Sequence, residues 1–278
     1  MLVSTTWLKD NLDDVVVLDA SWHMPGTGRD AHAEYLACRI KGAQRFDIDV
    51  IADPESSLPH TLPTPEGFAQ AVSAVGISNT TTVVVYEESR LFAAPRARWM
   101  FKVMGHDALI LEGGLAAWRE AGYPVETGEP AAPQTKGTFT AKRDPSILAD
   151  ADLVAEWLAR GGQVADVRSP ARFEGVEPEP RQGVRGGHMP GALNAHYASL
   201  LDDAGRLKGQ DELRKVITQS GLDPAQPMIA SCGSGVSAAI LALALERVGG
   251  HARVYDGSWS EWGADLSRPV VTGKAGKP

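Results

Sequence analysis

Short, mainly apolar runs alternate along the chain with stretches of helical periodicity, and the same order occurs twice. Residues 15–18 and 82–86 are such runs in the first half, and residues 163–167 and 227–231 occupy the matching places in the second half. Apolar runs of this length between turn residues indicate buried strands. Strands that alternate with helical stretches predict an α/β fold, in which a mostly parallel sheet is flanked by helices.

Equivalent residues of the two halves are separated by a nearly constant number of positions. Asp166 follows Asp19 by 147 positions, and Trp262 follows Trp118 by 144 positions. Self-similarity at a fixed spacing is the signature of repeated architecture. We therefore expect an internal duplication that gives two tandem α/β domains of similar structure.

A segment rich in proline, glycine and small polar residues separates the two copies. It covers residues 126–137, with the sequence Glu-Thr-Gly-Glu-Pro-Ala-Ala-Pro-Gln-Thr-Lys-Gly. Such a composition is typical of linkers. The sequence thus predicts an N-terminal domain at residues 1–126, a linker at 127–140 and a C-terminal domain at 141–278.

The charge balance argues against two classes of partner. The 278 residues include 27 lysines and arginines and 35 aspartates and glutamates, which gives a formal net charge of −8. A negative protein is disfavoured as a partner of nucleic acid or of an anionic membrane. No apolar run approaches the roughly 18 residues of a membrane-spanning helix, and the N-terminus lacks the layout of a signal peptide. We expect a cytoplasmic protein.

The chain contains two cysteines, Cys38 and Cys232. Two cysteines are too few for a disulfide framework or a cysteine-rich zinc site, and the seven histidines show no metal-ligand spacing. We expect no metal and no cofactor. Cys38 belongs to a helical stretch without a glycine loop, so we interpret it as a packing residue.

Cys232 follows a predicted buried strand and begins the loop Cys-Gly-Ser-Gly-Val-Ser, which precedes an apolar helical stretch. Glycines let such a loop curl so that successive backbone N–H groups point into one concave site, and the helix start adds its own free donors. These donors favour the thiolate, which is the nucleophilic form of cysteine. The pattern favours a catalytic Cys232 over a buried packing residue. The first half has no cysteine in the matching segment, residues 87–92.

The duplicated layout, the single cysteine loop and the segment Tyr-Asp-Gly-Ser-Trp at 255–259 resemble two-domain sulfurtransferases of the rhodanese type. Within that family the loop of Cys232 is similar to the C-G-S-G-V-T loop of 3-mercaptopyruvate sulfurtransferases, whereas thiosulfate-preferring members have C-R-K-G-V-T. The resemblance implies two tandem rhodanese-like domains. It also implies that the loop residues bind the substrate: Gly233, Gly235, Val236 and Ser237.

A second motif supports the same subfamily. The segment from Arg172 to Arg181 is similar to part of the family's G-R-F-x-G-x-x-P-E-P-R, in which both arginines bind the carboxylate and carbonyl of the substrate. A guanidinium suits a planar carboxylate because it donates two parallel hydrogen bonds. The residues alone also allow a surface charge or an internal ion pair with Glu174, Glu177 or Glu179.

One position departs from the family pattern. The family has a histidine, proposed to relay protons with an aspartate and the loop serine, where this chain has Arg39. Arginine does not titrate near neutral pH, so that relay cannot operate unchanged. Asp30 matches the aspartate and Ser234 matches the serine, and we expect Ser234 and water to carry the protons.

The resemblance implies transfer of sulfur from 3-mercaptopyruvate through a Cys232 persulfide, with release of pyruvate. The acceptor would be cyanide or a thiol such as thioredoxin or glutathione. Two alternatives stay open: a thiosulfate:cyanide sulfurtransferase, and a persulfide carrier or regulatory module with little turnover. A cysteine phosphatase with a related loop would need an arginine at position 238, where this chain has Ala238.

Overall fold

The computed structural model of the chain describes residues 1–88, 90–133 and 135–275, which form two compact units. Each unit combines the greater part of one half of the sequence with a short piece from the other half. The first unit contains Met1–Pro54, Leu62–Asp144 and Ala204–Arg206, and the second contains Glu55–Thr61, Pro145–Asp203 and the described chain from Leu207 onward.

The first unit is built on a five-stranded parallel sheet with the strand order β1-β6-β5-β2-β4. Its strands are β1 (Leu2–Val3), β2 (Val15–Asp19), β4 (Gln44–Arg45), β5 (Thr82–Tyr86) and β6 (Leu109–Leu111). Its helices are α1 (Thr5–Asp10), α2 (Ala31–Ala37), α3 (Ile48–Ile51), α4 (Pro65–Ala74), α5 (Ala94–Val103) and α6 (Gly114–Glu120). A small antiparallel pair joins β3 (Arg39–Ile40) to β7 (Val125–Glu126).

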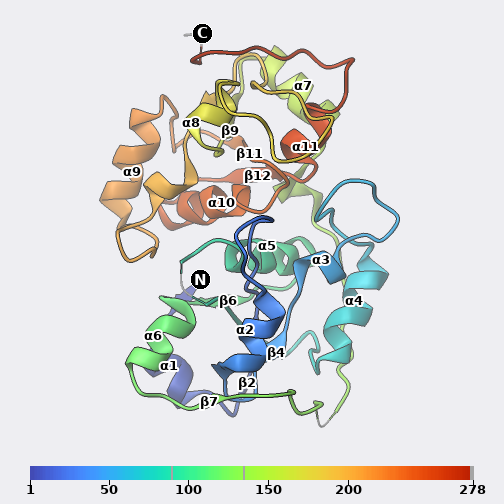
Figure 1. Cartoon of the computed structure of the whole chain (residues 1–278), viewed down its shortest axis with the longest axis vertical. Helices are drawn as coiled ribbons and strands as arrows, with labels where there is room; N and C mark the ends of the chain where they lie inside the picture. Colours follow the sequence, from blue (N-terminus) through green and yellow to red (C-terminus); the bar gives the residue numbers. More distant parts are fainter. Residues whose placement is uncertain (89, 134, 276–278) are drawn as a thin grey trace. The chain divides into compact units, whose positions relative to one another are not determined.

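The second unit repeats this plan with the strand order β10-β9-β11-β12-β8. Its strands are β8 (Leu148–Ala149), β9 (Gln163–Asp166), β10 (Leu193–Asn194), β11 (Met228–Ser231) and β12 (Ala252–Tyr255). Its helices are α7 (Ala151–Ala159), α8 (Pro170–Phe173), α9 (Gln210–Gln219), α10 (Ala238–Arg247) and α11 (Ser258–Trp262), with short 3₁₀ turns at Pro145–Ile147 and Tyr197–Leu200. Helices α7 and α11 lie on one side of this sheet and α9 and α10 on the other (Figure 1).

The two strand orders are the same when one is taken in the opposite direction, so the predicted duplication and the two α/β sheets are confirmed. The matched tryptophans give a further sign of this equivalence. Trp118 and Trp262 are buried in the cores of their units, and each indole N–H donates to a proline carbonyl, of Pro124 and Pro269, at 2.9 Å. Each unit therefore contains the same arrangement of a buried tryptophan and a proline carbonyl.

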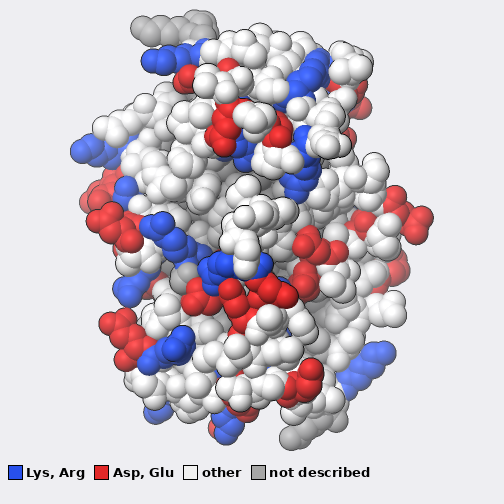
Figure 2. All heavy atoms as spheres, in the orientation of Figure 1, with Lys and Arg blue, Asp and Glu red and all other residues white. Residues whose placement is uncertain are grey.

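The distribution of charges and the character of the helices can be compared with the expectations from the sequence. Basic and acidic side chains are interspersed on the face shown in Figure 2. Within the described residues, no helix combines the length and the apolar character needed to cross a bilayer.

In a parallel sheet all carboxyl ends of the strands meet at one edge, where ligands of open α/β sheets bind. In the second unit this edge carries the residues that follow β9, β11 and β12. Cys232, directly after β11, is one of them.

Candidate active site

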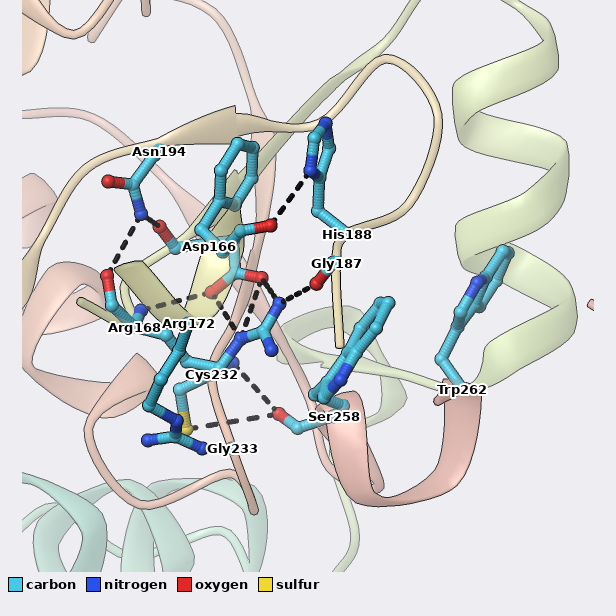
Figure 3. Close-up of polar contacts among 12 residues, drawn as sticks. Asp166, Arg168, Arg172, Gly187, His188, Asn194, Cys232, Gly233, Ser258 and Trp262 are labelled. Atoms are coloured by element: carbon cyan, nitrogen blue, oxygen red, sulfur yellow. Dashed lines mark hydrogen bonds and ion pairs between the residues drawn. The ribbon is translucent and has the colours of Figure 1, made fainter. Parts of the chain in front are cut away.

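Cys232 lies at the carboxyl end of β11, the central strand of the second sheet, and is 2% exposed. Its backbone is fixed by the first residues of α11: Cys232 N–H donates to the Ser258 hydroxyl at 3.1 Å, and Cys232 C=O accepts from Trp259 N–H at 3.0 Å. The Ser258 Oγ lies 3.9 Å from the Cys232 sulfur (Figure 3). The thiol is thus held at the edge of the sheet where the fold places a ligand.

We call residues 232–237 the cysteine loop, and its peptide groups are oriented by α11. The carbonyl of Gly233 accepts from both the N–H and the hydroxyl of Ser260, at 2.9 and 2.6 Å. Within the described chain, the backbone N–H groups of Gly233, Ser234, Val236 and Ser237 donate to no protein acceptor. A buried set of unsatisfied N–H groups before a helix is suited to bind an anion.

Glycine is required at position 235 of this loop. Gly235 has a φ of +77°, in the left-handed region where other residues are strained. This conformation turns the chain into α10 directly after the loop.

Ser258 is a site residue that the sequence analysis did not single out. It is fully buried and has a φ of +50°, an uncommon conformation for a residue with a side chain. Its hydroxyl donates to the carbonyl of Tyr255 at 2.8 Å and accepts the Cys232 N–H. The signal available in the sequence was its place in the segment 255–259, which carries the family resemblance but does not reveal a contact with Cys232.

Arg172 lies in a buried network of two arginines and two carboxylates. Its Nη2 and Nε donate to the two carboxylate oxygens of Glu179, at 2.5 and 3.2 Å. Glu179 also accepts from Arg168 Nη1 at 2.7 Å. Arg168 in turn pairs with Asp166 at 2.6 Å, as Figure 3 shows. Of the three glutamates that the sequence left open as partners of Arg172, Glu179 is therefore the one that pairs with it.

The guanidinium of Arg172 also lies against the cysteine loop. A Cβ atom added to Gly233 would lie 3.1 Å from Arg172 Nη2, closer than ordinary van der Waals contact. A side chain at position 233 would thus require the Arg172 guanidinium to move by a few tenths of an ångström. The structure brings together three predicted site residues here: Cys232, Gly233 and Arg172.

The second predicted arginine has a different neighbour. Arg181 Nη2 lies 3.5 Å from Nε2 of His60, a buried residue with a φ of +60°. His60 comes from the segment Glu55–Thr61, which belongs to the second unit although it lies in the first half of the sequence.

The proposed proton carriers occupy distinct environments. The Ser234 hydroxyl makes no hydrogen bond to any described residue, although Ser234 is only 7% exposed. Asp30 belongs to the first unit, where its carboxylate caps α2 by accepting from the N–H groups of His32 and Ala33 at 2.9 and 3.0 Å.

Arg39, at the position of the family's histidine, is a buried residue that contacts the backbone and an aromatic ring of the first unit. It is buried, its guanidinium donates to the carbonyls of Gly128 and Glu129, and it lies 5.0 Å from the centre of the Tyr35 ring. Cys38, beside it, packs against the apolar core of the first unit. Arg39 therefore ties β3 to the chain that follows β7.

The matching loop of the first unit has a glutamate where the second has the cysteine. Glu87 follows β5 as Cys232 follows β11, and its buried carboxylate accepts from the N–H groups of Phe92, Ala93 and Ala94 at 2.7, 2.9 and 3.2 Å. Burial raises the pKa of Glu87 to about 7, while these three donors oppose the rise because they stabilise the charged form. The loop of the first unit thus contains its own acceptor for these N–H groups.

A cavity of about 390 Å³ lies in the second unit beside the turn after β12. Three carboxylates, of Asp150, Asp256 and Glu261, and one guanidinium, of Arg253, are among the groups that line it. An excess of carboxylates disfavours an anionic ligand there. The predicted site residues do not line this cavity.

Comparison with known proteins identifies the family. The model of the rhodanese-like domain matches twice, over residues 4–121 and 150–265. The chain belongs to the rhodanese family. The resemblance to two-domain sulfurtransferases is thereby confirmed, and the two matches fall on the two copies of the duplication.

Curated relatives and solved structures agree with this family over nearly the whole chain. The 3-mercaptopyruvate sulfurtransferase of Escherichia coli is 40% identical, with 96% of each chain covered. A protein of Arabidopsis thaliana named thiosulfate/3-mercaptopyruvate sulfurtransferase 1, mitochondrial, is 39% identical, covering 97% of this chain and 77% of that protein. The crystal structure of the Escherichia coli enzyme SseA matches with a TM-score of 0.83 and 37% identity, covering 93% of this chain and 98% of that chain. These relatives support sulfur transfer as the activity of this rhodanese.

Proposed function

We propose that this rhodanese transfers sulfur from 3-mercaptopyruvate to a thiol, through a persulfide on Cys232, and releases pyruvate. The observation that carries the proposal is the position of the Arg172 guanidinium next to Gly233 and the buried thiol of Cys232. It supports a donor that presents a carboxylate to the arginine and a sulfur atom to Cys232. Relatives from Escherichia coli and Homo sapiens carry the name 3-mercaptopyruvate sulfurtransferase.

In the first half-reaction the Cys232 thiolate attacks the sulfur of the donor. A sulfur–sulfur bond forms and the carbon–sulfur bond of the donor breaks, so that its electron pair leaves with carbon as the enolate of pyruvate. The enolate takes a proton, for which Ser234 with water is our candidate route, and we keep Asp30 as a candidate that acts through them. In the second half-reaction an acceptor thiolate attacks the outer sulfur and frees the Cys232 thiolate.

The cysteine loop has a defined role in this scheme. The N–H groups of Gly233, Ser234, Val236 and Ser237, which donate to no acceptor within the described chain, stabilise the negative charge of the persulfide, as an oxyanion hole stabilises an oxygen. Gly235 sets the turn that presents them. Arg172 and Arg181 bind the carboxylate and carbonyl of the donor. Splitting the transfer into two covalent steps predicts ping-pong kinetics.

The loop sequence favours 3-mercaptopyruvate over thiosulfate. In the C-R-K-G-V-T loop of thiosulfate-preferring members, an arginine stands at the position of Gly233. Its Cβ would lie 3.1 Å from Arg172 Nη2 in this structure, so the Arg172 guanidinium would have to shift by a few tenths of an ångström. The loop here also lacks the two positive charges that a dianion such as thiosulfate favours.

The test is release of pyruvate from 3-mercaptopyruvate, with and without thioredoxin or glutathione as acceptor. We expect turnover by the native protein and none by Cys232→Ser, with the gain of one sulfur atom on Cys232 seen by intact-mass analysis. Turnover by the Cys232→Ser variant would refute the mechanism. A persulfide without repeated release of pyruvate would indicate a carrier instead of an enzyme.

Thiosulfate is the second candidate donor, because the Arabidopsis relative is named for both substrates. Comparison of kcat/KM for the two donors, with cyanide as acceptor, decides between them, and a higher value for thiosulfate would overturn our choice. A cytoplasmic location stays a prediction.

A further inference from the structure

We propose that Glu179 is a positioning residue for donor binding: it fixes the Arg172 guanidinium beside the cysteine loop and leaves one edge of that guanidinium free for the donor. The inference deepens the function proposed above and rests on it. Glu179 has no role in the sequence motif beyond its place between the two arginines. Its role follows from contacts that only the fold reveals.

The first step is that Glu179 itself cannot move. Its side chain is 4% exposed, and its carboxylate is held by Arg168 at 2.7 Å. Arg168 is anchored on three sides: it pairs with Asp166 at 2.6 Å, donates to the carbonyl of Gly187 at 2.8 Å, and lies 4.2 Å from the centre of the Trp259 ring. Glu179 is therefore a fixed acceptor.

The second step is that Glu179 sets the orientation of Arg172. Two parallel hydrogen bonds, from Nε and Nη2, hold the plane of the guanidinium to the plane of the carboxylate. The same Nη2 atom faces Gly233. The hydrogen bonds to Glu179 thus orient the guanidinium next to Gly233. Figure 3 shows Arg172 beside Cys232 and Gly233.

The third step concerns the atom that is left over. Nη1 of Arg172 makes no hydrogen bond to any residue that the structure describes, while Nε and Nη2 are both used. The Arg172 side chain is 14% exposed, so the group is accessible. Nη1 is the donor that we assign to the carboxylate or carbonyl of the substrate.

The fourth step is the charge of the network. Arg168 and Arg172 balance Asp166 and Glu179, so the network attracts an anion through directed hydrogen bonds more than through net charge. In that case donor affinity depends on where Nη1 points. Without Glu179 the long Arg172 side chain would sample several rotamers, and ordering it would oppose donor binding.

The experiment uses Glu179→Gln, with Glu177→Gln as the matched control. Both remove one carboxylate charge from the same segment, but Glu177 is exposed, and among the described residues the Arg172 guanidinium is hydrogen-bonded to Glu179 and not to Glu177. For Glu179→Gln we expect the KM for 3-mercaptopyruvate to rise about tenfold, with kcat changed about twofold or less. Glu177→Gln should keep the native KM. A KM that is unchanged or lower in Glu179→Gln would overturn the proposal, because Glu179 would then be neutral or a competitor of the donor.

A second measurement needs no sulfur donor. The alkylation rate of Cys232 is compared for iodoacetate, which carries a carboxylate, and for iodoacetamide, which is neutral. If Glu179 positions Arg172, Glu179→Gln lowers the ratio of the two rates about tenfold. General loosening of the loop would change both rates alike and leave the ratio unchanged, which would overturn the proposal. Because this ratio does not involve 3-mercaptopyruvate, it separates failure of the inference from failure of the proposed function.

A double-mutant cycle tests whether Glu179 acts through Arg172. In the Arg172→Ala background, Glu179→Gln should have no further effect on the alkylation ratio. Additive effects would show that Glu179 acts by another route and would overturn the proposal. Should Glu179→Gln fail to fold, Glu179→Asp keeps the charge but is too short to hold both arginines in the same geometry, and it should lower the same ratio.

Discussion

The buried carboxylate of Glu87 makes the stability of the first unit depend on pH near neutrality. Burial raises the pKa of Glu87 to about 7, against 4.5 for the unperturbed group, and the charge of Asp19 adds to the rise. The folded protein therefore binds a proton at Glu87 over a pH range in which the unfolded chain does not. In that range the free energy of unfolding increases as the pH falls.

The size of the effect follows from the shift. Each pKa unit corresponds to about 1.4 kcal/mol, so the whole shift corresponds to about 3 kcal/mol. Most of this change in the free energy of unfolding should occur between about pH 7.5 and about pH 5, a range that lies largely between the two pKa values. Above the folded pKa the carboxylate is charged in both states, and its contribution no longer changes with pH.

The assay compares the native protein with Glu87→Gln, which cannot titrate. Unfolding in urea is followed by hydrogen exchange of the amides of β5 and α5, which report on the first unit. The difference in free energy of unfolding, native minus variant, should grow by about 2–3 kcal/mol between about pH 7.5 and pH 5. Glu88→Gln removes an equivalent charge from the next residue, which pairs with Arg29, and should keep the native pH dependence. A difference that is flat, or that grows with rising pH, would refute the reasoning.

Three further substitutions test other contacts. Ser258→Ala leaves the buried Cys232 N–H without its acceptor, so we expect a loss of about 1–3 kcal/mol in urea unfolding and a changed alkylation rate; native values for both would contradict this. Gly233→Ala places a methyl group 3.1 Å from Arg172, so the KM for 3-mercaptopyruvate should rise in steady-state assays, and an unchanged KM would show that the arginine is free to move. Arg39→Ala removes the hydrogen bonds from β3 to two carbonyls after β7 and should lower the Tm of the first unit, whereas an unchanged Tm would deny these bonds a structural role.

The parts of the fold that the sequence predicts are those with a local physical cause. Continuous apolar runs mark the central strands because both faces of a parallel sheet are covered. The place of Cys232 at the edge of the sheet follows from the strand before it and the glycines after it. The duplication then predicts that the same arrangement occurs twice, and the strand orders agree.

The parts that the sequence does not predict depend on contacts between distant segments. Three glutamates follow Arg172 closely, and their spacing does not reveal that Glu179 is the one fixed by Arg168. The contact of Ser258 with Cys232 spans 26 positions and requires an uncommon backbone conformation. The assignment of residues 55–61 to the second unit is likewise a product of tertiary packing.

The two loops differ in what their backbone N–H groups have as an acceptor. In the first unit the acceptor is the side chain of Glu87, so the N–H groups of Phe92, Ala93 and Ala94 have a partner for the lifetime of the chain. In the second unit the loop N–H groups donate to no acceptor within the described chain, and in the proposed cycle the persulfide on Cys232 becomes their partner. Because a ligand that binds only the folded state stabilises it, each turnover would also tighten and then loosen the second unit. The free energy of unfolding of the second unit would thus rise when Cys232 carries a persulfide and fall when the sulfur is transferred. That of the first unit would not change during the cycle.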